Sequence, residues 1–205
     1  MKHILATLTI VLVLGGTRVM AAETGPVSAP LEPMAEPAMH VGDKETWRNK
    51  KGEEWTRTVV GLDETTVTFE GRDGCTFTRP HEVFAQWLKW TNCPRDGSGT
   101  TSLTKGDIWP LETGRKWWYK YAGSNKKGQK WKGKMSCKVK EEIRISVPAG
   151  AFDTFHVVCK TKRITREYYI SPETGTNVMY KRTHKYGKQP ARAQELVSYS
   201  PKEAG

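Results

Sequence analysis

A basic, aromatic stretch in the middle of the chain offers the clearest chemistry. Residues 114–134, GRKWWYKYAGSNKKGQKWKGK, contain three tryptophans, two tyrosines and eight basic residues, and no acid. Lysine and arginine attract phosphates and carboxylates, and an aromatic ring can stack on a base or a sugar. The stretch therefore predicts a surface for an anionic polymer such as lipopolysaccharide, an acidic glycan or nucleic acid.

The same stretch also fits a β-hairpin with one buried and one solvated face. Along 130–140 the even positions are lysines and one serine, whereas the odd positions are Trp131, Gly133, Met135, Cys137 and Val139. This period of two is typical of a half-buried strand. Before the turn, Trp117 shares a face with two tyrosines, and Trp118 falls on the basic side. The candidate anion-binding residues are those of the basic side: Lys116, Trp118, Lys120, Lys130, Lys132, Lys134, Lys138 and Lys140. They form either a ligand-binding surface or only the solvent-exposed face of a strand.

Catalytic motifs are missing from the sequence. There is no GxSxG, HExxH, CxxC or phosphate-binding glycine loop. The segment HEVFA at 81–85 starts like a zinc-protease helix but has Ala85 where the second histidine is required. His156 alternates with apolar neighbours in a strand pattern, so we expect it to face solvent. We identify no catalytic, cofactor-binding or metal-ligating residue and expect no cofactor; a hydrolase of unrecognised type is the enzymatic alternative.

Four cysteines have the spacing of disulfides rather than of a zinc site. Cys75, Cys93, Cys137 and Cys159 contain no close CxxC pair. A turn near Pro148–Gly150 would place Cys137 opposite Cys159. We therefore expect the bonds Cys75–Cys93 and Cys137–Cys159, each worth on the order of 3 kcal/mol through the loop that it closes.

The start of the chain is typical of an exported protein. Residues 1–21 combine a short basic region, an apolar run and small residues before a cleavage site after Ala21 or Ala22. We expect a periplasmic or secreted protein with no membrane span in its mature form. Residues 22–40 are rich in proline and predict a disordered linker. The formal charge of the whole chain is +11, and loss of Lys2 and Arg18 leaves 11 − 2 = +9.

The rest of the chain predicts an all-β fold of short antiparallel meanders. A first β unit spans 41–103, with a short helix near 81–91 suggested by apolar residues at helical spacing after Pro80. A second unit spans 104–200 and contains the VPAGAF hairpin. The heptads NKKGEEW and NKKGQKW, at 49–55 and 125–131, suggest similar turns in both units. The meanders would form a curved sheet, as a half-barrel, barrel or sandwich.

Several runs resemble uncharacterised secreted proteins of Gram-negative bacteria that are known only as domains of unknown function. The runs are IWPLETGRKWW, SVPAGAFDTFHVVCK, EYYISPETGTNVMYK and ELVSY, within 105–200, with a looser match at the VGD of 41–43. The resemblance implies a periplasmic or secreted β-rich domain, with a curved sheet similar to the half-barrels of lipoprotein carriers. It implies no chemistry.

Three functions follow from these features. The first is a non-enzymatic binding module of the cell envelope, and the second is a cationic binder of an anionic polymer. The third is the unrecognised hydrolase. The sequence names no partner; an anionic envelope polymer is the candidate that its charge favours.

Overall fold

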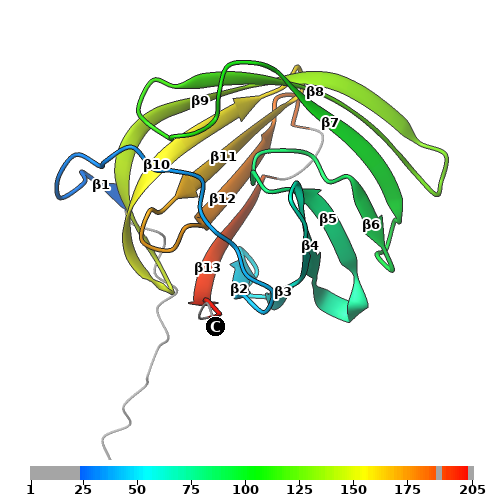
Figure 1. The fold of residues 1–205 in the computed structure, drawn as a ribbon, viewed down its shortest axis with the longest axis horizontal. Coiled ribbons are helices and arrows are strands. Elements are labelled where there is room, and N and C mark those ends of the chain that lie inside the picture. Colours follow the sequence, from blue (N-terminus) through cyan, green and yellow to red (C-terminus); the bar gives the residue numbers. More distant parts are fainter. Residues whose placement is uncertain (1–23, 188–190, 203–205) are drawn as a thin grey trace, which may run out of the picture.

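The protein is a closed antiparallel β-barrel. The computed structural model describes residues 24–187 and 191–202. Twelve strands follow one another around the barrel in chain order, and β13 pairs with β2 to close it (Figure 1). They are β2 (Lys44–Asn49), β3 (Glu54–Leu62), β4 (Thr66–Glu70), β5 (Thr76–Pro80), β6 (Lys89–Thr91), β7 (Gly97–Lys105), β8 (Lys116–Asn125), β9 (Lys130–Val147), β10 (Gly150–Lys160), β11 (Ile164–Ile170), β12 (Asn177–His184) and β13 (Arg192–Ser200). A two-residue strand, β1 (Thr24–Gly25), adds to the far end of β9.

The all-β prediction is confirmed, and its barrel form is the one observed. Both expected β units belong to the same closed sheet, and the boundary near residue 103 falls inside β7. The predicted turn at 148–150 separates the paired strands β9 and β10. Because each strand pairs with the next in the chain, short turns suffice for most of the barrel.

The predicted helix near 81–91 is wrong. Residues 81–88 form an irregular loop that leads into β6, and the helical element in the described residues is a single 3₁₀ turn, η1 (Arg72–Gly74). Phe84 explains the loop, because it is fully buried with its ring 5.1 Å from Trp117 and 5.2 Å from Tyr168. Burial of this ring in the barrel outweighs the local helical pattern.

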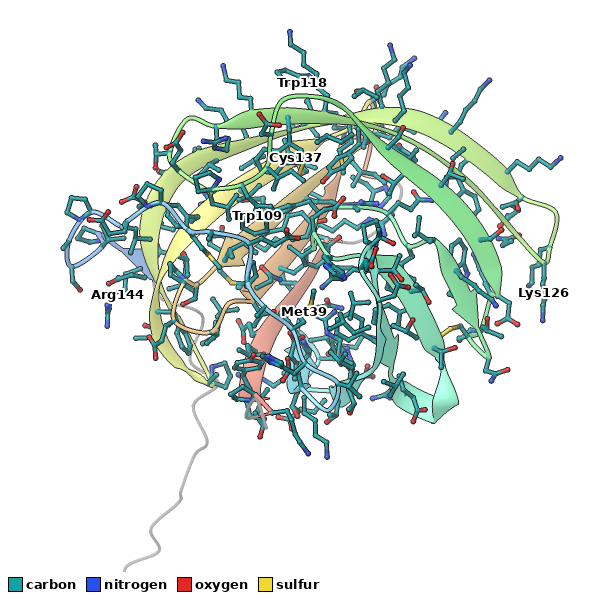
Figure 2. The ribbon with its side chains drawn as sticks, viewed as in Figure 1. Met39, Trp109, Trp118, Lys126, Cys137 and Arg144 are labelled. Carbon is teal, nitrogen blue, oxygen red and sulfur yellow. A yellow bond between two sulfur atoms is a disulfide. The ribbon has the colours of Figure 1, made fainter. Side chains whose placement is uncertain are left out.

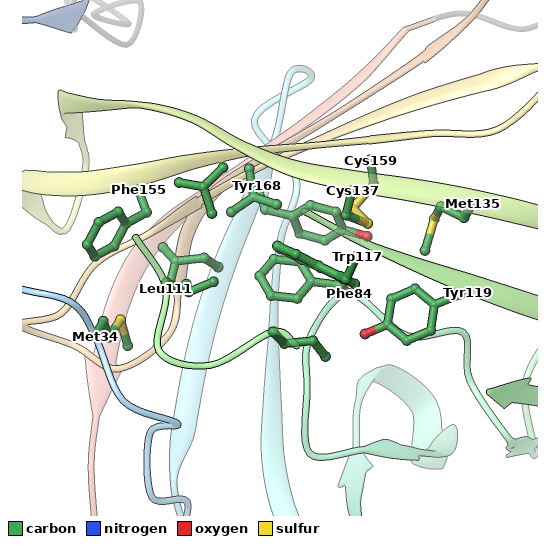
Figure 3. Close-up of a cluster of buried hydrophobic side chains, with 14 residues drawn as sticks. Met34, Phe84, Leu111, Trp117, Tyr119, Met135, Cys137, Phe155, Cys159 and Tyr168 are labelled. Carbon is green, nitrogen blue, oxygen red and sulfur yellow. A yellow bond between two sulfur atoms is a disulfide. The ribbon is translucent and has the colours of Figure 1, made fainter. Parts of the chain in front are cut away.

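Alternation along β8 and β9 fills the barrel with side chains. Trp117 lies opposite Cys137 and Tyr119 opposite Met135, and all four are buried. Figure 3 shows them packed with Phe84 and with side chains from distant strands. The odd-numbered face of β9 is therefore the inner face, as the sequence predicts, although Trp131 near the strand's start is only half-buried.

Both expected disulfides are present. Cys137 and Cys159 are directly opposite each other on β9 and β10, and their bond lies in the main core cluster. The bond between Cys75 and Cys93 joins the connections that follow η1 and β6. Each bond therefore links neighbouring parts of one sheet.

The two related heptads form matching turns. Asn49 Oδ1 accepts hydrogen bonds from the backbone N–H groups of Lys51 and Glu53, while Asn125 Oδ1 accepts from those two and four residues further on. The glycine that follows the lysine pair has positive φ in both turns, 81° at Gly52 and 74° at Gly128. The recurrence thus has a local cause in turn chemistry.

The predicted linker is ordered where the structure describes it. Met34 is buried and forms a β-bridge with Leu111, and the Leu31 N–H donates to Glu142 Oε2 at 2.9 Å. The segment after β1 crosses the barrel on its way to β2 (Figure 1). Its apolar side chains join the core, which a mobile tether could not do. The predicted signal peptide, 1–21, lies outside the described residues.

Candidate functional site

The predicted basic residues meet on the outer face of β8 and β9. Opposite residues on paired strands point to the same side of a sheet, and Lys116 lies opposite Lys138 and Lys120 opposite Lys134. Side chains on these strands extend from the convex side of the barrel, where Trp118 is found (Figure 2). We call this surface the lysine face; its members are Lys116, Trp118, Lys120, Lys130, Lys132, Lys134 and Lys138.

The lysine face lacks neighbouring acids. Across β7, β8 and β9 its lysines lie opposite only lysine, alanine or serine, and on β10 the partner of Lys138 is Val158. None of its lysines forms an ion pair with any carboxylate in the described part of the chain. Like charges directly opposite one another destabilise a sheet, so this arrangement opposes folding.

Lys140 is the one predicted anion-binding residue that does not belong to the lysine face. A bulge in β9 follows Val139, and the Lys140 ammonium lies 2.7 Å from Glu141 Oε1. This hydrogen bond raises the pKa of Lys140. Its charge is therefore neutralised, unlike those of the lysine face.

Trp118 is continuous with the lysines. It lies between Ser136 on β9 and Lys105 on β7, and the Lys105 ammonium is 5.3 Å from the centre of its ring. The ring is half-buried. A ligand could contact the ring and the ammonium together, although Lys105 already covers part of the aromatic face.

A shallow depression of about 630 Å³ opens beside the lysine face. Short side chains of β7 and β8 on the outer face, among them Ala122, form its floor. Its polar lining comes from Ser98, Thr100, Ser124, Lys130 and Lys132. Hydroxyl groups and ammonium groups together can hydrogen-bond both the hydroxyls and the acid groups of a sugar.

Relatives of the fold exist among solved structures. The hypothetical lipoprotein YmcC of Escherichia coli K12 matches with a TM-score of 0.51 at 8% identity, over 78% of this chain and 86% of that chain. The two proteins share a fold. This barrel agrees with the β-rich architecture that the resemblance implied.

Two further structures match more weakly. A protein of Bacteroides fragilis NCTC 9343, described as exported with a YmcC-like fold, has a TM-score of 0.46 at 12% identity, over 82% and 99% of the two chains. A protein of Parabacteroides distasonis ATCC 8503, described as a lipoprotein, has a TM-score of 0.43 at 10% identity, over 83% and 100%. No known protein family and no curated protein matches the chain. Within 24–187 and 191–202, no helix is long and apolar enough to cross a membrane.

His156 corrects the expectation of a solvent-facing histidine. It lies on the face opposite to Phe155, yet it is only 5% exposed. Its Nδ1 is 3.0 Å from Glu141 Oε1, its Nε2 is 3.0 Å from Glu167 Oε2, and its ring stacks on Tyr169 at 4.5 Å. Hydrogen bonds from Lys140 and then from His156 lower the pKa of Glu141. The histidine therefore ties β9 to β11 across β10.

The inner face holds charges that the sequence pattern did not reveal. Glu45 is buried and accepts hydrogen bonds from Arg57, Trp47 and Thr176. Burial alone would raise the pKa of Glu45, but the charge and hydrogen bond of Arg57, together with the hydrogen bonds from Thr176 and Trp47, hold that pKa below its usual value. Buried Arg79 lies nearby, and Glu45 and Arg79 both line a cavity of about 40 Å³. This cavity could hold a few waters but no larger substrate.

Proposed function

We propose that the protein is an exported, non-enzymatic β-barrel that binds an acidic polysaccharide of the cell envelope through its lysine face. The predicted signal peptide supports export, and the continuous row of lysines without acidic partners supports the ligand. That row is the observation that carries the proposal. Lysines opposite one another reduce the stability of the sheet. A solvent-facing strand surface could instead mix lysines with acids, so the uniform positive charge favours a role in binding.

A polysaccharide fits the surface better than nucleic acid does. Proteins that bind single strands usually present several aromatic rings on which successive bases stack. The lysine face offers one, Trp118, and Lys105 lies over it. By contrast, the adjacent depression supplies serine and threonine hydroxyls, which suit a ligand rich in hydroxyl groups.

Binding should be specific for acidic polymers and strongly salt-dependent. Each acid group that meets a lysine releases bound counterions, so five contacts should lower the affinity by about a hundredfold or more between roughly 50 and 200 mM salt. Titration calorimetry of the mature protein against heparin, dextran and single-stranded DNA at both salt concentrations tests this. Heparin should bind with that salt dependence, and dextran should not bind. Equal affinity for dextran, or tighter binding of DNA than of heparin, would contradict the proposal.

A further inference from the structure

Three arginines form a row across the inner face of β11, β12 and β13. Arg166 lies opposite Arg182, and Arg182 lies opposite Arg192. Arg166 also lies opposite Cys159, whose disulfide is inside the barrel, and its Nη1 is 3.9 Å from Met135 Sδ. The register therefore places all three side chains on the inner face. We call this set the arginine row.

The positive charge of the arginine row is not balanced. None of its guanidinium groups pairs with a carboxylate in the described residues, and the buried Nε of Arg182 has no hydrogen-bond partner. Burial, together with Arg166 and Arg192, lowers the pKa of Arg182. Three adjacent like charges on a partly buried wall are unfavourable unless an anion joins them.

The wall beside the row is aromatic and polar. Tyr168, Tyr180 and Gln194 form the next cross-strand row on the same face, and the two tyrosine rings are 5.2 Å apart. Burial raises the pKa of Tyr180 to about 12, so its hydroxyl keeps its proton and can donate. A bound anion would thus meet hydrogen-bond donors beyond the guanidinium groups.

One end of the row is exposed to solvent. Arg192 is exposed at the start of β13, whereas Arg166 and Arg182 are half-buried further along the wall. The loop 81–88, which carries Phe84 into the core, connects β5 to β6 at the other end of the barrel. An anion from solvent would therefore first meet the row at Arg192, at the end of the barrel where β13 begins.

We propose that the arginine row binds a phosphate group inside this end of the barrel. Guanidinium groups offer paired N–H donors in a planar fork that matches phosphate oxygens. Three such forks exceed what the two oxygens of one carboxylate can accept, but a phosphate has more oxygens and a second negative charge. The site is separate from the lysine face and does not depend on the polymer proposal.

Calorimetry and thermal unfolding with inorganic phosphate test this site. At matched ionic strength, phosphate at about ten times its Kd should raise the Tm of the parent by roughly 3 °C or more, and chloride should not. The double variant Arg166→Gln/Arg182→Gln should lose at least about tenfold in phosphate affinity. Arg182→Lys keeps the charge without the fork and should lose less.

The lysine face supplies the matched control. The variant Lys130→Gln/Lys132→Gln/Lys134→Gln removes three positive charges from the outside and should bind phosphate like the parent. A second titration with glycerol 1-phosphate distinguishes the sources: tighter binding assigns the group to an ester, and equal binding assigns free phosphate. Equal stabilisation by chloride, or unchanged phosphate affinity in the arginine double variant, would overturn the site whether or not the polymer binds.

Discussion

The lysine face and the arginine row are both rows of like charge across paired strands, but they differ in surroundings. The lysines are exposed on the convex outside beside serine and threonine, whereas Arg166 and Arg182 are half-buried beside tyrosines. Lysine carries a compact, strongly hydrated charge, and arginine carries a less hydrated, rigid fork. The outer row therefore suits loose contacts along a polymer, and the inner row suits one discrete anion.

A third group of charges, on the inner face, is neutralised by an ion pair. Glu45 and Arg57 are paired on the inner face, where Glu45 also accepts from Trp47 and Thr176. This pair completes its own hydrogen bonding and needs no ligand. The arginine row has no such acid, so the inner wall contains both a satisfied and an unsatisfied set of charges.

Substitution of two neighbouring tryptophans gives the strongest test of which face of β8 is inside the barrel and which is outside. Trp117 is fully buried inside, and Trp118 is half-buried outside. Trp117→Ala should lower the free energy of unfolding by about 3 to 5 kcal/mol, because it leaves a cavity in the core. Trp118→Ala should cost about 1 kcal/mol or less. Urea denaturation measures both, and equal losses would show that the faces are assigned wrongly.

Removal of the paired inner acid should also destabilise the barrel. Glu45→Gln leaves the half-buried Arg57 without its carboxylate, at a cost of about 3 kcal/mol at neutral pH. Because the pKa of Glu45 is lowered in the folded state, its contribution is present above its ordinary value of 4.5 and is lost as the pH falls below that value. The gap between parent and variant should therefore shrink in acid. A gap independent of pH between 3 and 7, measured by denaturation, would contradict the pairing.

Removal of an unpaired inner arginine should have the opposite sign. Without phosphate, Arg182→Gln should raise the free energy of unfolding by up to about 1 kcal/mol, because it relieves repulsion from Arg166 and Arg192. Arg182→Lys retains the charge and should leave stability nearly unchanged. Thermal unfolding in phosphate-free buffer compares them, and a loss of stability in the glutamine variant alone would show that the guanidinium is already satisfied.

Local patterns predicted much of this barrel. Alternation along 130–140 separated the inner from the outer face of β9, and the same alternation placed Cys137 across from Cys159. Glycine and asparagine marked the turns at 49–53 and 125–129. Each of these features depends on residues that are near one another in the chain, so the sequence shows them directly.

Features that depend on distant contacts could not be predicted in this way. Phe84 and Met34 leave their local patterns to fill the barrel, and only the closed sheet supplies the space. His156 is buried, and its ring nitrogens contact glutamates from two other strands. The arginine row requires the register of three strands, although Arg166 shares the period-two face of Tyr168 in the sequence. The lysine face was visible as a pattern, and its ligand is still a prediction.

Heparin affinity as a function of salt tests most directly whether the lysine face binds an acidic polymer. Lys130→Gln/Lys132→Gln/Lys134→Gln should be compared with Lys44→Gln/Lys50→Gln/Lys51→Gln, whose exposed lysines lie on β2 and its turn, on the other side of the barrel. Both variants lose the same charge. Only the first should bind more weakly, with a log–log salt slope reduced by roughly one per lysine removed. Equal affinity and slope in the two variants would contradict the account.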